Sequence, residues 1–68
     1  MKELIKKGTC MAIFENGEYT GFSCNMDKDR ELEIGDVFIW NPWNKEGMGE
    51  KFKVIGFGDL IVRVEETK

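Results

Sequence analysis

Short runs of alternating apolar and polar residues fill most of the chain, and this spacing is typical of β-strands that bury one face. Clusters that contain glycine, asparagine or aspartate separate the runs, as expected for turns. Residues Met1–Lys7 could form a helical turn or an additional edge strand, and the sequence leaves both alternatives open. The pattern therefore predicts an all-β chain built mainly from hairpins.

The clearest predicted element is a hairpin centred on Asn16-Gly17. A two-residue type I′ turn requires positive φ at both central positions, which asparagine and glycine adopt readily. We expect its strands to be Thr9–Glu15 and Glu18–Cys24.

The two cysteines lie in this hairpin. With Asn16-Gly17 as the loop, Cys10 faces Ser23 and Cys24 faces Thr9, so the two thiols point to opposite sides of the ribbon. A disulfide needs side chains that point toward each other, so we expect two free thiols, as in a reducing compartment. A metal site is not expected from this pair, because the chain has no histidine and no Cys-x-x-Cys motif.

The middle of the chain is predicted to be a long charged loop followed by a third strand. The loop runs from Asn25 to Glu33, and the strand begins near Asp36 and ends before Pro42, which cannot donate to a sheet ladder.

This third strand, the segment 37–40, is apolar on both faces. If Val37 and Ile39 face the core, Phe38 and Trp40 form an exposed aromatic platform beside Trp43 on the following loop. If Phe38 and Trp40 face inward, they fill the core. Trp43 would then cover an open end of the barrel or bind a partner. The inward alternative is favoured for Trp40, because tryptophan is highly buried on average.

The C-terminal run "KFKVIGFGDLIVRVEE" predicts a second hairpin with its turn near Gly58-Asp59. Either a bulge at Gly56 or a three-residue loop would keep lysine off the buried face. In both cases the inner face holds Phe52, Val54, Leu60, Val62 and Val64, and the outer face holds Lys53, Ile55, Ile61, Arg63 and Glu65.

Five short strands in 68 residues predict one domain spanning residues 1–68, closed as a small five-stranded barrel of antiparallel hairpins. The hydrophobic content of 41% and charged content of 34% are typical of a globular domain. No apolar run approaches the ~20 residues of a membrane helix, and the basic start lacks the apolar region of a signal peptide, so we expect a cytoplasmic protein without membrane contact.

The segment "RELEIGDVFIW", Arg30 to Trp40, resembles the diverging-turn region of SH3 domains, with Leu32 followed by Gly35-Asp36 and an apolar strand. The resemblance implies an SH3-like barrel. The tyrosine-rich stretch, adjacent tryptophan pair and terminal Pro-Ser-x-Tyr element of eukaryotic SH3 domains are absent, so binding of proline-rich ligands is not implied. Other SH3-like barrels serve as RNA-, DNA- and protein-binding modules, including small stand-alone bacterial and phage proteins.

The residue types in the sequence give little support for a catalytic function. Without histidine, the chain lacks the commonest general base and metal ligand, and a cysteine nucleophile would lack an imidazole partner. The acidic stretch 27–36 has five acids and two bases, but its spacing does not match a calcium loop. We therefore expect a protein without enzymatic activity, cofactor or metal.

Two binding hypotheses follow. The first is a module that docks on a larger protein and modulates it, such as a phage or mobile-element protein. It would use the aromatic cluster and the acidic loop: Phe38, Trp40, Trp43, Asp27, Asp29 and Glu31. The second is a nucleic-acid-binding barrel with a local basic strip, although the net charge of −3 disfavours it. That strip would consist of Lys45, Lys51, Lys53 and Arg63 around the tryptophans.

The expected oligomeric state is a monomer or a weak homodimer. A homodimer would form through the outer apolar positions Ile55, Phe57 and Ile61.

Overall fold

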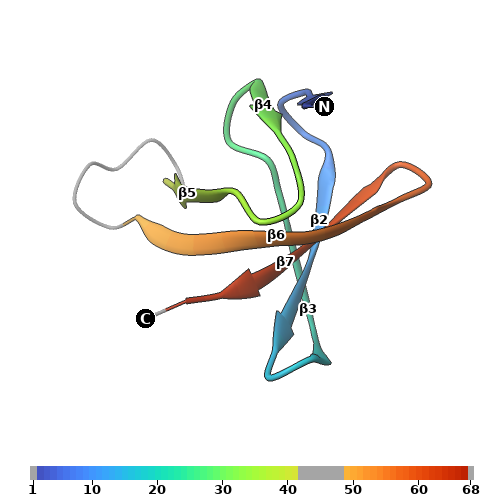
Figure 1. Ribbon diagram of the computed structural model, residues 1–68, viewed down its shortest axis with the longest axis vertical. Helices are drawn as coiled ribbons and strands as arrows, with labels where there is room; N and C mark the ends of the chain where they lie inside the picture. The colour runs from blue at the N-terminus through green and yellow to red at the C-terminus, as the bar shows by residue number, and fades with distance from the viewer. Residues whose placement is uncertain (1, 42–48, 68) are drawn as a thin grey trace.

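Seven strands in two sheets make up the residues described by the computed structural model, which are 2–41 and 49–67, and no helix is present among them (Figure 1). The strands are β1 (Glu3–Ile5), β2 (Cys10–Glu15), β3 (Glu18–Asn25), β4 (Arg30–Leu32), β5 (Val37–Trp40), β6 (Glu50–Gly58) and β7 (Ile61–Glu66). The all-β prediction is confirmed. The predicted strand count of five is wrong because two short strands, β1 and β4, were not expected as a pair.

The larger sheet has the strand order β3-β2-β7-β6-β5. Three of its ladders are antiparallel, including both predicted hairpins, whereas β2 and β7, which join the two hairpins, run parallel and were not predicted to pair. The parallel pair arises because the C-terminal hairpin inserts between the first hairpin and β5. Within the described residues β3 and β5 remain sheet edges, and no closed barrel is observed.

The first hairpin follows the predicted register only near its turn. Asn16 and Gly17 have φ angles of 52° and 82°, and Phe14 lies opposite Tyr19, as predicted. Between Ala12 and Phe14 the register shifts, because β3 bulges around Gly21, whose φ is 86°.

Beyond this bulge the predicted cysteine partners are wrong by two positions. Cys10 pairs with Asn25 instead of Ser23, and Cys24 pairs with Met11 instead of Thr9. Both cysteines are nevertheless free, as predicted. A shift of two residues preserves the alternation of faces, which explains why the thiol prediction remained correct despite the register error.

The second hairpin contains the predicted bulge, between Val54 and Gly56. Leu60, however, does not lie on the inner face. It occupies the turn with a φ of 58° and is 93% exposed, because Gly58 pairs with Ile61 and leaves residues 59 and 60 as the loop.

The smaller sheet pairs β1 with β4 and covers one side of the core. Ile5 and Leu32 are its buried residues, and they contact the cluster formed by the larger sheet. The N-terminal residues are therefore a strand instead of a helical turn, and the predicted loop Asn25–Glu33 contains β4.

The core is apolar, and Phe52 packs at its centre between two aromatic rings. Its ring centroid lies 6.1 Å from those of both Phe38 and Trp40, and Phe52 is fully buried. The inward alternative for β5 is thus the observed one, while Val37 and Ile39 are about half exposed. The buried cluster comprises Ile5, Met11, Met26, Leu32, Phe38, Phe52, Val54, Val62 and Val64.

Side chains connect β5 to the segment that follows β3. The Trp40 indole Nε1 donates to the carbonyl of Asn25 at 2.8 Å, and the Arg30 guanidinium donates to the carbonyl of Ile39 at 2.6 Å. The backbone N–H of Asn41 donates to Asp27 Oδ2 at 3.1 Å. The edge of β5 is therefore capped by side chains instead of by another strand, which protects it from pairing with another chain.

The turn before β5 is the segment that resembles SH3 domains. Gly35 has a φ of 98°, its N–H donates to the Val54 carbonyl, and the Val54 N–H donates to the Asp36 carbonyl, both at 2.8 Å. The Asp36 carboxylate accepts hydrogen bonds from the Glu33 N–H and from Lys2 Nζ. The Gly-Asp pair thus fixes the start of β5 against β6.

Candidate binding surface

The predicted aromatic site divides between the core and a segment outside the described residues. Phe38 is buried, and Trp40 is half-buried with its indole N–H satisfied. Trp43 and Lys45 lie outside the described residues. Phe38 and Trp40 thus stabilise the fold and do not form an exposed platform.

The predicted acidic residues have different surroundings. Asp27 is nearly buried and accepts hydrogen bonds from Arg30 Nε at 3.3 Å and Nη2 at 3.0 Å. Burial alone would raise the pKa of Asp27, but the hydrogen bonds from Arg30 and Asn41 and the Arg30 charge lower it below the ordinary value. Asp29 accepts from the Lys7 N–H, whereas Glu31 is exposed on β4. Asp27 is therefore engaged internally.

The basic residues on the two C-terminal strands share one face of the larger sheet. Lys53 pairs with Val37 on one side and with Glu65 on the other, and Lys51 pairs with Ile39. Arg63 lies on the same face of β7, because Val62 and Val64 point into the core. Strand pairing thus places Lys51, Lys53 and Arg63 on one face, whereas Trp40, beside which the basic strip was predicted, packs against the core.

This face also carries an aromatic pair that was not predicted from the sequence to take part in binding. Phe14 and Tyr19 are cross-strand partners whose ring centroids are 5.6 Å apart, and Tyr19 is 55% exposed. Phe22, in the bulged part of β3, is 72% exposed. The turn register already placed Phe14 opposite Tyr19, so their shared face could have been recognised. The exposure of Phe22 depends on the bulge.

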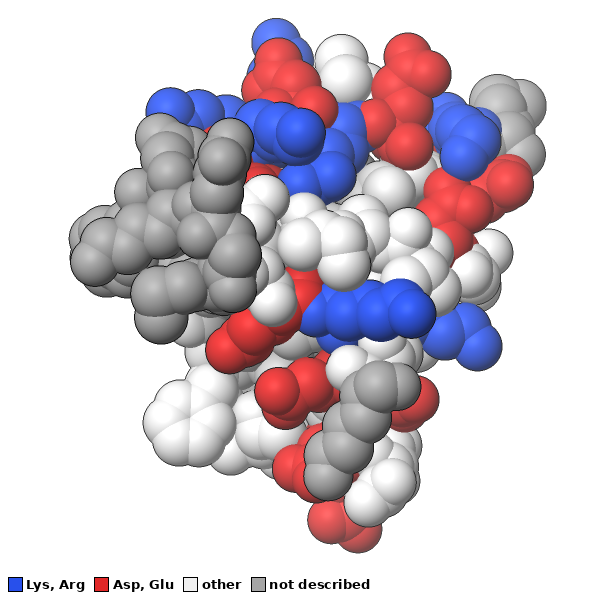
Figure 2. Space-filling view, turned by 90° about the vertical axis from the view of Figure 1, so that its left-hand side faces the viewer, with Lys and Arg blue, Asp and Glu red and all other residues white. Residues whose placement is uncertain are grey.

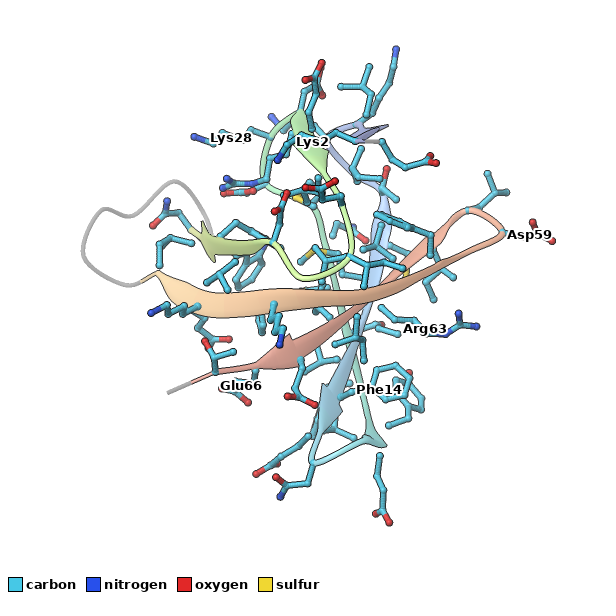
Figure 3. The ribbon with its side chains drawn as sticks, in the orientation of Figure 1. Lys2, Phe14, Lys28, Asp59, Arg63 and Glu66 are labelled. Carbon is cyan, nitrogen blue, oxygen red and sulfur yellow. The ribbon has the colours of Figure 1, made fainter. Side chains whose placement is uncertain are left out.

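We define the outer sheet face by the solvent-facing residues of these five strands. One row crosses all five strands, from Tyr19 through Phe14, Glu65 and Lys53 to Val37. Figure 3 shows Phe14 and Arg63 projecting to the same side. The outer sheet face comprises Phe14, Tyr19, Val37, Ile39, Lys51, Lys53, Arg63 and Glu65.

Arg63 lies across Gly56 and Gly58 of β6. Its guanidinium and Cδ atoms are within about contact distance of Gly56 and Gly58, as a Cβ built at Gly58 would lie 3.4 Å from Nη2 and 3.6 Å from Cζ. The guanidinium therefore lies beside both glycines, at distances that correspond to ordinary van der Waals contact with an added Cβ.

Charges of opposite sign occupy different parts of the molecule. In the space-filling view, acidic side chains predominate in the lower part, at the level of the β2–β3 hairpin, whereas basic and acidic side chains mix at the top (Figure 2). The hairpin itself contributes Glu15 and Glu18 and no lysine or arginine. The negative net charge is thus distributed unevenly.

A second surface feature is an open hollow of about 370 Å³ lined by Glu3, Glu33, Ile34 and Phe57. Phe57 packs partly against the core, opposite Val62, so it does not share the outer position predicted for it with Ile55 and Ile61. Those two isoleucines are half-buried. The three residues predicted for a homodimer contact therefore do not form one exposed patch.

Chemically reactive groups are sparse in the described parts of the chain. Within them, no group of three or more histidine, cysteine or acidic side chains is arranged to hold a metal ion. Burial raises the pKa of Cys24 to about 11, and the Glu50 charge adds to this effect, so its thiolate is scarce at neutral pH. Among residues 2–41 and 49–67 there is no helix long and apolar enough to cross a membrane.

Comparison of the chain with protein-family models, with curated proteins and with solved structures found no match.

Proposed function

We propose that this chain is a small, non-enzymatic binding module that docks onto a larger protein through the outer sheet face. The observation that carries the proposal is the pair of half-buried Phe14 and exposed Tyr19 beside Arg63 on one continuous sheet. Tyrosine, phenylalanine and arginine are enriched at protein interfaces, and a hydrogen-bonded sheet holds them in place without a large ordering cost.

The charges of the face favour a protein partner. Lys53 lies opposite Glu65 on the neighbouring strand, and Arg63 precedes Glu65 by two positions, so the face presents both signs to a partner. A protein surface can match such a pattern by placing opposite charges at each position, whereas a nucleic-acid backbone offers negative charge alone.

The proposal also covers the type of β-fold and the cellular setting. We infer an SH3-like barrel, supported by the Gly35–Asp36 turn against Val54 and by the side chains that bridge β5 to the end of β3. The free thiols fit a reducing cytoplasm. A stand-alone phage or bacterial modulator protein is the corresponding biological role.

A nucleic-acid-binding barrel is the second candidate. It is favoured by the location of Lys51, Lys53 and Arg63 on the same face as Phe14 and Tyr19, because cations beside aromatic rings bind single strands. The net charge of −3 and the position of Glu65 within the face weigh against it.

Site-specific crosslinking in the producing cell tests the docking face. A photoreactive phenylalanine replaces Tyr19 in one sample and Ile34, which is 65% exposed away from the outer sheet face, in the control. We expect a discrete protein adduct from position 19 and none from position 34. The same protein should be recovered by the wild-type chain and lost with Tyr19→Ser combined with Phe14→Ser.

The second candidate has its own readout. Fluorescence anisotropy of a labelled single-stranded oligonucleotide, titrated at low and moderate salt, should show no binding if the protein-docking proposal is correct. Binding with a steep salt dependence, weakened by Lys53→Gln, would instead establish the nucleic-acid function. The docking face would be refuted if the photoreactive residue gave the same adducts at positions 19 and 34 and no adduct were specific to position 19.

A further inference from the structure

The guanidinium of Arg63 lies over β6 and leaves its donors accessible. An added Cβ at Gly56 would lie 3.9 Å from Nη1, and one at Gly58 would lie 3.4 Å from Nη2, so the guanidinium rests over the backbone of both glycines. The residue is nevertheless exposed. A planar cation that rests on a strand loses less side-chain entropy when it binds than one that extends freely into solvent.

No carboxylate neutralises this guanidinium within the described residues. The ion pairs there join Lys2 to Asp36 and Arg30 to Asp27, and the Arg63 side chain has no hydrogen bond or ion pair with the described residues. Its cross-strand neighbours are Ala12 on β2 and Gly56 on β6. Glu65 lies two residues further along the same face but is not within ion-pair distance.

Apolar surface adjoins the charge on one side. Phe14 is the diagonal neighbour of Arg63 across the parallel β2–β7 ladder, and Phe14 packs against Tyr19. Figure 3 shows the Phe14 and Arg63 side chains extending from neighbouring strands to the same side of the sheet. An occupant of this surface would therefore meet an arginine fork and an aromatic ring next to each other.

We infer that the partner of the outer sheet face places a carboxylate on Arg63 and an adjacent apolar side chain on the Phe14–Tyr19 pair. The inference rests on the proposed function, and it specifies the chemistry of the partner: a protein segment with Asp or Glu beside an aromatic or aliphatic residue. The guanidinium fork matches both oxygens of a carboxylate, and such charge-assisted pairs are the stronger hydrogen bonds.

Peptide selection on the folded chain tests this chemistry directly. The immobilised protein is used to select from a random linear peptide library, and the enriched peptides are then synthesised for affinity measurement by isothermal titration calorimetry. We expect enrichment of Asp or Glu next to an apolar residue. Arg63→Gln should weaken the acidic peptides about tenfold or more, since a hydrogen bond to a charged group contributes about 1.5–3 kcal/mol.

Matched variants test whether binding depends on the position of the positive charge or only on its presence. Lys28→Gln removes the same charge from an exposed residue that lies far from Arg63 in Figure 3, and it should leave affinity unchanged. Arg63→Lys keeps the charge but loses the fork, and it should weaken binding by a smaller factor. Circular dichroism confirms that each variant is folded.

The outcomes distinguish this inference from the function on which it rests. Acidic peptides that depend on Arg63 but not on Lys28 support it. The carboxylate assignment is overturned if the enriched peptides lack acidic residues, or if they bind Arg63→Gln as tightly as wild type. In that case the outer sheet face still binds peptides, and Tyr19→Ser should abolish that binding. Failure of the wild-type chain to enrich any peptide counts against both.

Discussion

The ion pair that caps β5 should contribute measurably to folding. Asp27→Asn removes the charge on which three hydrogen bonds converge, two from Arg30 and one from the Asn41 N–H. The side chains of Asp27 and Arg30 are only 8% and 15% exposed, so water compensates poorly for the loss.

The expected loss in the free energy of unfolding is about 2 kcal/mol. Each hydrogen bond to a charged group contributes about 1.5–3 kcal/mol, but asparagine keeps a weaker version of one or two of them. Arg30 also retains its bond to the Ile39 carbonyl and its position 4.9 Å from the Phe38 ring centroid. For a domain of this length, about 2 kcal/mol corresponds to a fall in Tm of about 8–16 °C.

Urea denaturation followed by tryptophan fluorescence measures the effect. Asp59→Asn is the matched control, because Asp59 is exposed in the β6–β7 turn, and its substitution should change stability by less than about 0.5 kcal/mol. A double-mutant cycle with Arg30→Gln should show coupling between the two residues. Equal, small effects of Asp27→Asn and Asp59→Asn would refute the capping role of the pair.

The pH dependence provides a second check on the same pair. The pKa of Asp27 is lower in the folded chain than in the unfolded chain, so its carboxylate stabilises the fold above the unfolded value of about 3.9. That contribution is lost as the pH falls through the folded pKa. The stability difference between wild type and Asp27→Asn should therefore be full near neutral pH and shrink below about pH 4. A constant difference down to lower pH would contradict the assignment.

Three further substitutions test other parts of the structure. Leu60→Asn should raise stability by about 1 kcal/mol in thermal melts, because Leu60 is almost fully exposed at a φ of 58° that asparagine tolerates better; a decrease would refute backbone strain there. In a Cys10→Ser background, iodoacetamide should alkylate Cys24 at least about tenfold more slowly in the folded chain than in urea, since burial raises its pKa to about 11; equal rates would contradict this burial. Phe52→Ala should lose about 3–5 kcal/mol and leave the chain largely unfolded by circular dichroism, whereas a cooperative melt near that of wild type would contradict its central position.

Local patterns in the sequence were sufficient for the hairpin turns and much of the core. Asn16-Gly17 specified its turn because few residue pairs accept two positive φ angles, and the alternation of Phe52, Val54, Val62 and Val64 identified the buried face. These features depend on backbone sterics and on period-two burial, which act over a few residues. The residues proposed for binding were found less well, because the aromatic residues predicted to bind were Phe38, Trp40 and Trp43 instead of Phe14 and Tyr19.

Other features depended on contacts between distant segments. The parallel pairing of β2 with β7 and the pairing of β1 with β4 join residues far apart in sequence, and no local pattern encodes such neighbours. Contacts between distant segments also decided which apolar face of β5 is buried. Phe38 and Trp40 face inward because Phe52 on β6 supplies the aromatic surface against which they pack.

The sequence alone thus determined an all-β chain with free thiols and no histidine chemistry, since alternation and residue inventory are local properties. Tertiary structure alone decided where the residues of the proposed docking face lie. Lys51, Lys53 and Arg63 share a face with Phe14 because β7 inserts between β2 and β6. The Arg63 guanidinium lies beside Gly56 and Gly58 because the bulged pairing of β6 with β7 brings these residues together. Strand order is set by the burial of the whole apolar cluster, which is a property of the folded chain.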